Sequence, residues 1–274
     1  MVKTFEYLKY TLKIIADPEC RQDQKERRAL NRELERLSKL ARFTPSQINF
    51  KGEELELLDP LTFLANYREM FEKNIYKFNS KCPDPYILDC GANVGLSVLY
   101  FKQLYPNSEI VAFEPDPNIF AKLARNVQSM NLKNVTLVPK AVWKEQTTLP
   151  FILEGGNSSR IANKSDSTTV DVETITLRSF INRHVDFLKI DIEGAEVDVL
   201  ENCRDLLDHV ERIFVEYHSV ASQLQRLHDL LQILSSAGFS YYIDRTGVTS
   251  ANPLSQIRVS SIGMDLQLNI FGYR

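Results

Sequence analysis

The segment ILDCGANVG (residues 87–95) is the most informative part of this chain of 274 residues. An apolar run ends in an acidic residue, Gly91 and Gly95 follow four positions apart, and a helical pattern begins at Leu96. This order predicts a buried strand, a tight turn where a ligand can approach the backbone, and the start of a helix. The turn differs from the dinucleotide fingerprint G-x-G-x-x-G, because the middle small residue of that fingerprint is absent and Asn93 stands in the turn. It also differs from a P-loop, since no Gly-Lys-Ser/Thr follows.

Two acidic residues indicate which ligand the turn binds. Asp89 stands just before the glycines, which suits a ligand that carries an amino group better than a pyrophosphate. Glu114 ends a second apolar run and lies 19 residues beyond Gly95, and an acid at about that spacing accepts hydrogen bonds from both ribose hydroxyls. Together they predict S-adenosylmethionine as the cofactor. Asp89 is expected to contact the methionine amino group or to orient the turn, and capping of the next helix is the alternative.

Four stretches of the chain resemble one known family. They are LDCGANVGLSVLYF (88–101), VAFEPDPNIFAKLARNVQSMNLKNVTLV (111–138), FLKIDIEGAEVDVL (187–200) and IFVEYH (213–218). They look like the FkbM family of S-adenosylmethionine-dependent methyltransferases, over roughly residues 75 to 245. The resemblance implies an α/β fold with the seven-stranded, doubly wound (Rossmann-like) sheet of class I methyltransferases. It also implies that the seventh strand runs antiparallel between the fifth and the sixth.

The alternation of strand and helix patterns agrees with a parallel sheet joined by right-handed crossovers. Helices are expected over 117–130 and 221–236, and the connection 246–263 is much longer than a hairpin requires. Such long connections are often functional. Strands are expected at 86–90, 110–114, 135–138, 185–191, 212–217, 239–243 and 266–271.

The first 80 residues are interpreted as a helical N-terminal extension, and residues 81–274 as the methyltransferase domain. Within 1–42, Leu30, Leu34, Leu37 and Ala41 fall at helical spacing and form one apolar face. This face is expected to pack on the catalytic domain, with a dimer contact or a lid as alternatives. The stretch 46–59 alternates apolar and polar residues around Lys51-Gly52, which predicts a hairpin, and a helical run over 60–78 follows.

The predicted cofactor site lies at the carboxyl ends of the strands, where parallel α/β sheets bind ligands. Asn93 is expected to bind the ligand or to stabilise its own turn. The stretch 140–142 is expected beside the adenine, where backbone groups can read its edge. The predicted cofactor-binding residues are Asp89, Gly91, Asn93, Gly95, Glu114, Pro115, Ala141 and Asp191.

The predicted catalytic residues are Asp191, Glu193 and His218, which follow the fourth and fifth strands. A histidine there can deprotonate a hydroxyl near neutral pH, although a structural bond to a loop is the alternative for His218. Substrate contacts are expected from Glu216 and from Asn157, Ser158 and Ser159, which match a glycine/serine segment of the family. No spacing demands a metal. The alternative to acid–base chemistry is a divalent ion such as magnesium, held by Asp191, Glu216 and His218.

Composition limits the class of partner and compartment. The net charge is −3 and the isoelectric point about 5.9, which gives no reason to expect a nucleic acid substrate. The cysteines have no C-x-x-C spacing, so we expect free thiols in a reducing compartment. The N-terminus has no signal-peptide pattern, and no apolar run is long enough to span a membrane. We therefore expect a cytoplasmic protein with a small-molecule acceptor, and a homodimer through the N-terminal helices is the alternative to their packing on the catalytic domain.

The preferred function is O-methylation of a hydroxyl on a sugar or secondary metabolite. The protein then mainly has to position and desolvate the reactants and remove a proton from the acceptor, because the sulfonium already activates the methyl group. One alternative is N-methylation of an amine or peptide. A second is a non-catalytic nucleotide-binding scaffold on the same fold.

Overall fold

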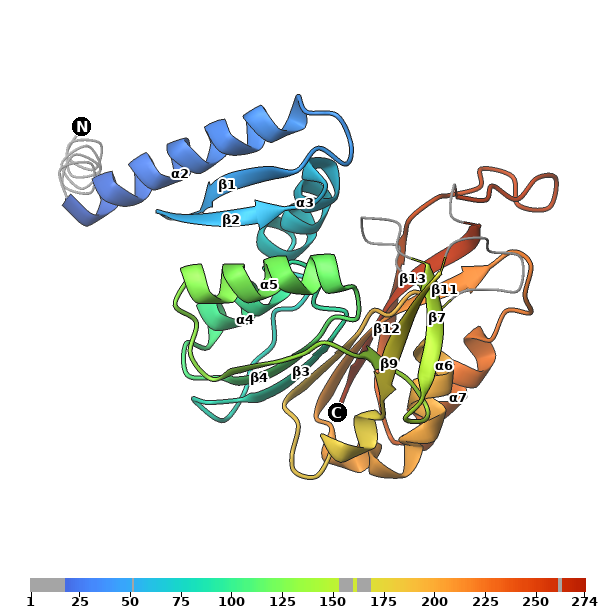
Figure 1. The fold of residues 1–274 in the computed structure, drawn as a ribbon. Coiled ribbons are helices and arrows are strands. Elements are labelled where there is room, and N and C mark those ends of the chain that lie inside the picture. Colours follow the sequence, from blue (N-terminus) through green and yellow to red (C-terminus); the bar gives the residue numbers. More distant parts are fainter. Residues whose placement is uncertain (1–17, 51, 153–159, 162–168, 261–262) are drawn as a thin grey trace, which may run out of the picture.

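A seven-stranded mixed sheet forms the centre of the molecule (Figure 1). The computed structural model describes residues 18–50, 52–152, 160–161, 169–260 and 263–274. The strand order is β12-β13-β11-β10-β3-β4-β5, and β13 runs antiparallel between β11 and β12, as predicted. The α/β doubly wound fold is thereby confirmed. The strands are β3 (Tyr86–Cys90), β4 (Glu109–Phe113), β5 (Val135–Val138), β10 (Phe187–Ile190), β11 (Arg212–Val220), β12 (Ser240–Thr246) and β13 (Met264–Tyr273).

The central strands are largely apolar because both faces of the sheet are covered, and the charged residues Asp89 in β3 and Lys189 in β10 are exceptions. In β3, Leu88 and Cys90 belong to one hydrophobic core, whereas Ile87 between them belongs to the other. The first core also takes apolar residues of α6 (Glu196–Asn202), α7 (Leu227–Ser236), η2 (Leu177–Ser179) and η3 (Arg204–His209). The second takes those of α4 (Leu96–Leu104) and α5 (Pro117–Ser129). The two-residue period of each strand therefore sorts its side chains between two helical layers.

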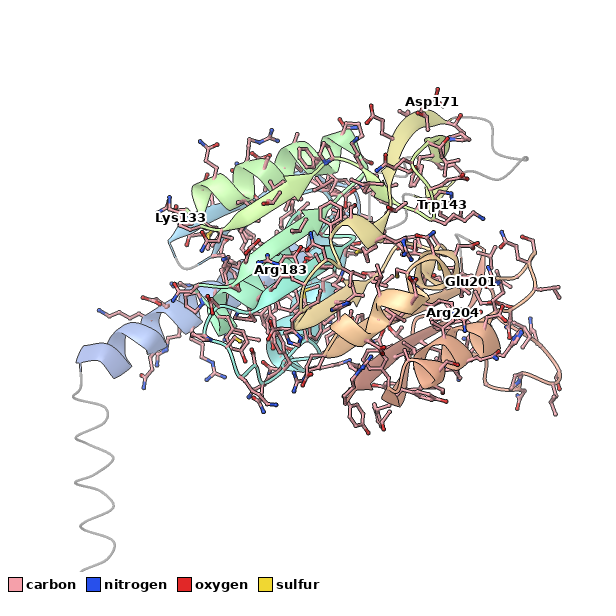
Figure 2. All side chains as sticks on the ribbon, turned by 90° about the horizontal axis from the view of Figure 1, so that it is seen from below. Lys133, Trp143, Asp171, Arg183, Glu201 and Arg204 are labelled. Carbon is pink, nitrogen blue, oxygen red and sulfur yellow. The ribbon has the colours of Figure 1, made fainter. Side chains whose placement is uncertain are left out.

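The N-terminal extension packs on the same face as α4 and α5. It consists of α2 (Pro18–Ser38), β1 (Ser46–Phe50), β2 (Glu53–Leu57) and α3 (Pro60–Tyr67), which continues as a π-helix, η1 (Arg68–Glu72). The hairpin between β1 and β2 confirms the prediction. Leu37 and Phe50 are buried in the core that contains Ile87. Figure 2 shows α2 projecting beyond the body of the molecule. Residues 1–17 lie outside the described part, and both the boundary at residue 80 and the homodimer stay predictions.

Two expected helices have other bounds in the structure, and one sheet was not expected. The helix expected over 60–78 ends at Glu72, since Asn74 has a left-handed φ of 57°. The helix expected from residue 221 begins at Leu227. Strand β11 continues to Val220 instead, and the chain must turn back before α7 can start. A second, four-stranded sheet was not predicted. Its order is β6-β9-β7-β8, with strands β6 (Ala141–Val142), β7 (Thr148–Ile152), β8 (Arg160–Ile161) and β9 (Val170–Ile175).

Cysteine chemistry and hydropathy agree with the expectations for the part of the chain that is described. Cys82, Cys90 and Cys203 are free thiols, and the last two are buried. Among the described residues, no helix combines the length and the apolar character that crossing a membrane requires.

Candidate active site

A cavity of about 400 Å³ opens at the carboxyl ends of β3, β4, β10 and β11. Most of the predicted site residues meet there, although they come from segments more than 100 residues apart in the sequence. Asp89 and Gly95 do not line it, and Asn157, Ser158 and Ser159 lie outside the described residues. The predicted residues that line it are Gly91, Asn93, Glu114, Pro115, Ala141, Asp191, Glu193, Glu216 and His218.

The glycines of the turn are required mainly by close packing of the protein itself. Gly91 has a φ of +87°, and a Cβ there would lie 1.9 Å from the carbonyl oxygen of Asp191. Gly95 has a φ of +93°, and a Cβ there would lie 2.8 Å from Leu123 Cδ1. Any other residue would be strained at both positions. The turn therefore stays in contact with the strand that carries Asp191, which brings the two halves of the site together.

Asn93 stabilises its own turn. It has a left-handed φ of 50°, which asparagine tolerates better than most residues. Its Oδ1 accepts a hydrogen bond from the backbone N–H of Val94 at 2.7 Å, and its own backbone N–H donates to Glu114 Oε2 at 3.0 Å. The second contact joins the turn to the end of β4.

Glu114 is held at the rim of the cavity by two backbone N–H groups. Its Oε2 accepts the hydrogen bond from Asn93, and its Oε1 accepts a hydrogen bond from the backbone N–H of Asp116 at 2.9 Å. The residue is only 5% exposed, and this burial raises the pKa of its carboxyl to about 8. Pro115 follows it, and Ala141 in β6 forms part of the same wall. This arrangement leaves a fixed carboxyl group that can accept hydrogen bonds from hydroxyls.

Asp89 corrects the sequence interpretation. It is completely buried and does not line the cavity, so its side chain is not positioned to contact a ligand amine directly. Its Oδ2 accepts a hydrogen bond from Ser97 Oγ at 2.5 Å, and its Oδ1 lies 3.2 Å from Lys189 Nζ. The strand β3 turns this side chain inward, towards α4. Of the three roles expected, orientation of the turn fits this position, since the N-cap of α4 is Gly95 and no side chain caps that helix.

Lys189 is a site residue that the sequence interpretation missed. Its side chain is 1% exposed, and its Nζ donates to the carbonyl oxygen of Gly91 at 2.8 Å. The same Nζ lies 3.4 Å from Asp191 Oδ2. Burial alone lowers the pKa of Lys189, but the carboxylates of Asp89 and Asp191 outweigh it and raise the pKa. The available signal was a lysine within an otherwise apolar strand, two positions before Asp191.

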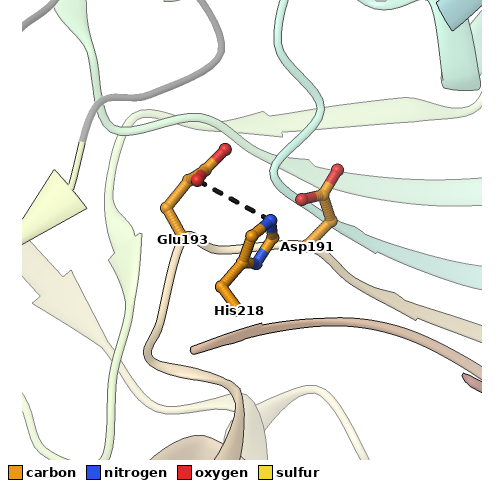
Figure 3. A group of neighbouring side chains, drawn as sticks. All are labelled: Asp191, Glu193 and His218. Carbon is orange, nitrogen blue, oxygen red and sulfur yellow. Dashed lines mark ion pairs between the residues drawn. The ribbon is translucent and has the colours of Figure 1, made fainter. Parts of the chain in front are cut away.

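Asp191, Glu193 and His218 line the cavity and form a cluster (Figure 3). One potential ligand atom from each lies within 4.8 Å of the others. His218 Nε2 lies 3.7 Å from Glu193 Oε2 and 3.7 Å from Glu216 Oε1. The structure thus groups Glu193, rather than the Glu216 of the predicted metal triad, with Asp191 and His218.

Glu196 is a second residue that was missed. Its charge lies in the first turn of α6, where an acidic residue is favourable, and Glu196 Oε1 also lies 3.0 Å from His218 Nδ1. The same oxygen accepts hydrogen bonds from the backbone N–H groups of Ile192 at 3.3 Å and Gly194 at 2.9 Å. No local pattern links residues 196 and 218, because only the pairing of β10 with β11 brings them together.

The carboxylates change the acid–base properties of the cluster. Burial by itself lowers the pKa of His218, but Glu193 and Glu196 outweigh it and raise the pKa well above its ordinary value. This differs from the expectation of an imidazole that titrates near neutral pH. Burial raises the pKa of Glu193 and of Glu216 to about 8. The cluster therefore holds more acidic groups than the neighbouring cations balance.

The N-terminal extension supplies part of the wall. Phe63 and Asn66 in α3 and Glu69 in η1 line the cavity opposite the strand ends. Burial raises the pKa of Glu69, which faces Asp191 among other charges. The sequence interpretation assigned no site residue to this extension, because only the packing of α3 onto the sheet directs these side chains into the cavity.

The sequence matches a known family of methyltransferases. A sequence model described as the methyltransferase FkbM domain matches residues 89–241. The chain is 27% identical over 230 residues to "Methyltransferase 1" of Beauveria bassiana, covering 70% of this chain and 91% of that protein. It is 26% identical over 157 residues to "2-O-methyltransferase NoeI" of Sinorhizobium fredii, covering 49% of this chain and 64% of the relative. A solved structure of methyltransferase FkbM from Methylobacillus flagellatus aligns with a TM-score of 0.45 and 16% identity, over 73% of this chain and 46% of that one.

Proposed function

Because the chain belongs to the FkbM methyltransferase family and is therefore a methyltransferase, we propose that it transfers the methyl group of S-adenosylmethionine to a hydroxyl. The acceptor is a small molecule, a sugar or another secondary metabolite. The observation that carries this proposal is that one cavity is lined by two chemically different groups of residues, which we call its first and second ends. Glu114 and the turn after β3 form the first end, and the cluster of Asp191, Glu193 and His218 forms the second.

The first end suits the donor. Glu114 can accept both ribose hydroxyls, as its equivalents do at the end of the second strand in nucleotide-binding sheets. Ala141 and its neighbours in β6 lie beside it, where an adenine would stack against an apolar wall. The carboxylates of the second end favour the positive sulfonium. Asp89 positions the turn through Lys189 and does not touch the donor.

The second end suits a hydroxyl acceptor, whose proton has to be removed as the oxygen attacks. The hydroxyl oxygen forms a bond to the methyl carbon while the bond from that carbon to sulfur breaks. The sulfur keeps the electron pair and becomes the neutral thioether of S-adenosylhomocysteine, and the proton passes to a neighbouring carboxylate. Such proton transfer contributes about 100- to 10,000-fold to a rate. The name of the relative NoeI, a 2-O-methyltransferase, also supports an oxygen acceptor.

The test is methyl transfer from S-adenosylmethionine tritiated on the methyl group. The full chain is incubated with separate panels of sugars, polyketide-type alcohols and amines, and labelled products are separated by chromatography. We expect label on hydroxyl acceptors, lost in Asp191→Asn and retained in Glu201→Gln, an exposed position of α6. Label confined to the amine panel would replace the proposal with N-methylation. Cofactor binding without transfer to any panel would contradict it.

A further inference from the structure

The distances within the cluster point to a ligand other than a proton. His218 Nε2 and Glu193 Oε2 are 3.7 Å apart, which is too far for a hydrogen bond. Ligand atoms on one metal ion, each about 2.0–2.2 Å from it, lie roughly 3–4.4 Å from one another. The spacing between these two atoms falls in that range. Asp191 offers a carboxylate oxygen close to these two atoms, since the three ligand atoms lie within 4.8 Å of one another.

One buried atom of the cluster, Glu193 Oε2, has no hydrogen-bond partner in the described part of the chain. The side chain of His218 is 1% exposed, and its one hydrogen bond among the described residues is made by Nδ1. Its Nε2 lies 3.7 Å from Glu193 Oε2 and 3.7 Å from Glu216 Oε1. Buried polar atoms are nearly always paired, so Glu193 Oε2 beside this nitrogen indicates a partner that the protein itself does not provide.

Glu196 prepares His218 for this role. A histidine that binds a metal through one ring nitrogen usually donates its other N–H to a carboxylate, which fixes the tautomer and the ring. Glu196 Oε1 lies 3.0 Å from Nδ1, and the N–H groups of Ile192 and Gly194 hold that carboxylate in place. With Nδ1 as the donor, the lone pair of Nε2 points towards Glu193 and Asp191.

We propose that Asp191, Glu193 and His218 bind a divalent metal ion that coordinates the oxygen of the methyl acceptor. Two carboxylate oxygens and one imidazole nitrogen suit a first-row ion such as Mn²⁺, which accepts both ligand types. Three protein ligands leave open positions for water or a hydroxyl. A bound cation makes a coordinated hydroxyl more acidic, and Glu216 beside His218 then receives the proton. Binding of the ion stands on the cluster alone, whereas its role in transfer rests on the proposed function.

The test is a titration of the metal-free full chain with Mn²⁺, in which free ion is measured by electron paramagnetic resonance. We expect one Mn²⁺ per chain in the wild type. Glu193→Gln and Asp191→Asn should each weaken binding on the order of 100-fold. Glu201→Gln in α6 is the matched control and should bind like the wild type, and circular dichroism establishes that each variant is folded.

The outcomes separate this inference from the proposed function. The metal site would be overturned if the wild type did not bind Mn²⁺, or if both site variants bound Mn²⁺ as tightly as the wild type does. Either result would count whether or not methyl transfer occurs. Binding that the site variants lose would support the site even if no acceptor is methylated, in which case the proposed function fails alone. Transfer that EDTA abolishes and Mn²⁺ restores would support both.

Discussion

Glu196 Oε1 lies 3.0 Å from His218 Nδ1, and both side chains are 1% exposed. This buried contact crosses from the start of α6 to strand β11 and fixes the orientation of the imidazole. The same carboxylate closes the turn that follows β10 through the N–H groups of Ile192 and Gly194. A single side chain therefore shapes the turn and positions the histidine.

We expect Glu196→Ala to destabilise the fold. The substitution leaves His218 Nδ1 and two backbone N–H groups without an acceptor, and each buried donor left unpaired costs about 1–3 kcal/mol. The free energy of unfolding, measured by urea denaturation, should fall by several kcal/mol. Glu201→Ala in the same helix removes an exposed carboxylate and should change it by less than about 0.5 kcal/mol. Equal free energies of unfolding for the two variants would show that the contact with His218 does not stabilise the fold.

Replacement of Glu114 should weaken cofactor binding. Glu114→Ala removes the proposed acceptor of the ribose hydroxyls, and loss of hydrogen bonds to a charged group costs about 1.5–3 kcal/mol. The affinity for S-adenosylhomocysteine, measured by isothermal titration calorimetry at pH 9, should fall accordingly. Glu109→Gln, at the exposed opposite end of β4, is the control. Unchanged affinity in Glu114→Ala would remove this residue from the cofactor site.

Binding of S-adenosylhomocysteine should become tighter as the pH rises towards 8. Burial raises the pKa of Glu114 to about 8, although the backbone hydrogen bonds from Asp116 and Asn93 and the charge of Lys189 act in the opposite direction. The ribose hydroxyls need the ionised carboxylate of Glu114. Below that pH the carboxyl is protonated in the free protein, so binding of S-adenosylhomocysteine must release its proton. The affinity should rise by up to about tenfold per pH unit and then level off. Calorimetry in buffers of different ionisation enthalpy measures this proton release, and Glu114→Ala should abolish it.

Asn126 should stabilise the attachment of the hairpin to the turn. Its Nδ2 donates to the carbonyl oxygens of Val94 at 2.8 Å and Glu56 at 3.1 Å, and its Oδ1 accepts from the N–H of Glu56 at 2.8 Å. Asn126→Ala leaves these groups unpaired, which should lower the free energy of unfolding by roughly 2–4 kcal/mol. Asn118→Ala, at an exposed position of the same helix, should have little effect in the same urea titration.

Loss of the charge on Lys189 should be strongly destabilising. Lys189→Met leaves Asp89 buried without its cation, and removal of one partner of a buried pair costs about 3–5 kcal/mol. Adding Asp89→Asn removes the uncompensated charge and should recover part of that loss. Thermal denaturation of the two single variants and the double variant measures the coupling. Strictly additive effects would show that Lys189 acts through its other contacts.

The sequence by itself determined the elements whose signals are local. The strand, turn and helix over residues 87–104 follow from one apolar run and two glycines, and the hairpin follows from alternation around Lys51-Gly52. Glu114 falls at the rim of the cavity because the spacing of a βαβ unit is fixed by the length of its helix. The place of β13 between β11 and β12 came from the family resemblance, since no local pattern states which strands pair.

Only the tertiary structure decided which acidic residues face the cavity and which partners they meet. Asp89 and Asp191 both follow apolar runs, yet the first turns inward to Lys189 and Ser97 while the second lines the cavity. Glu196 meets His218, and Glu69 of the extension lines the same cavity as the strand ends. Local patterns fix the period of an element, but contacts between distant residues depend on how the elements pack, and that information is spread over the whole core.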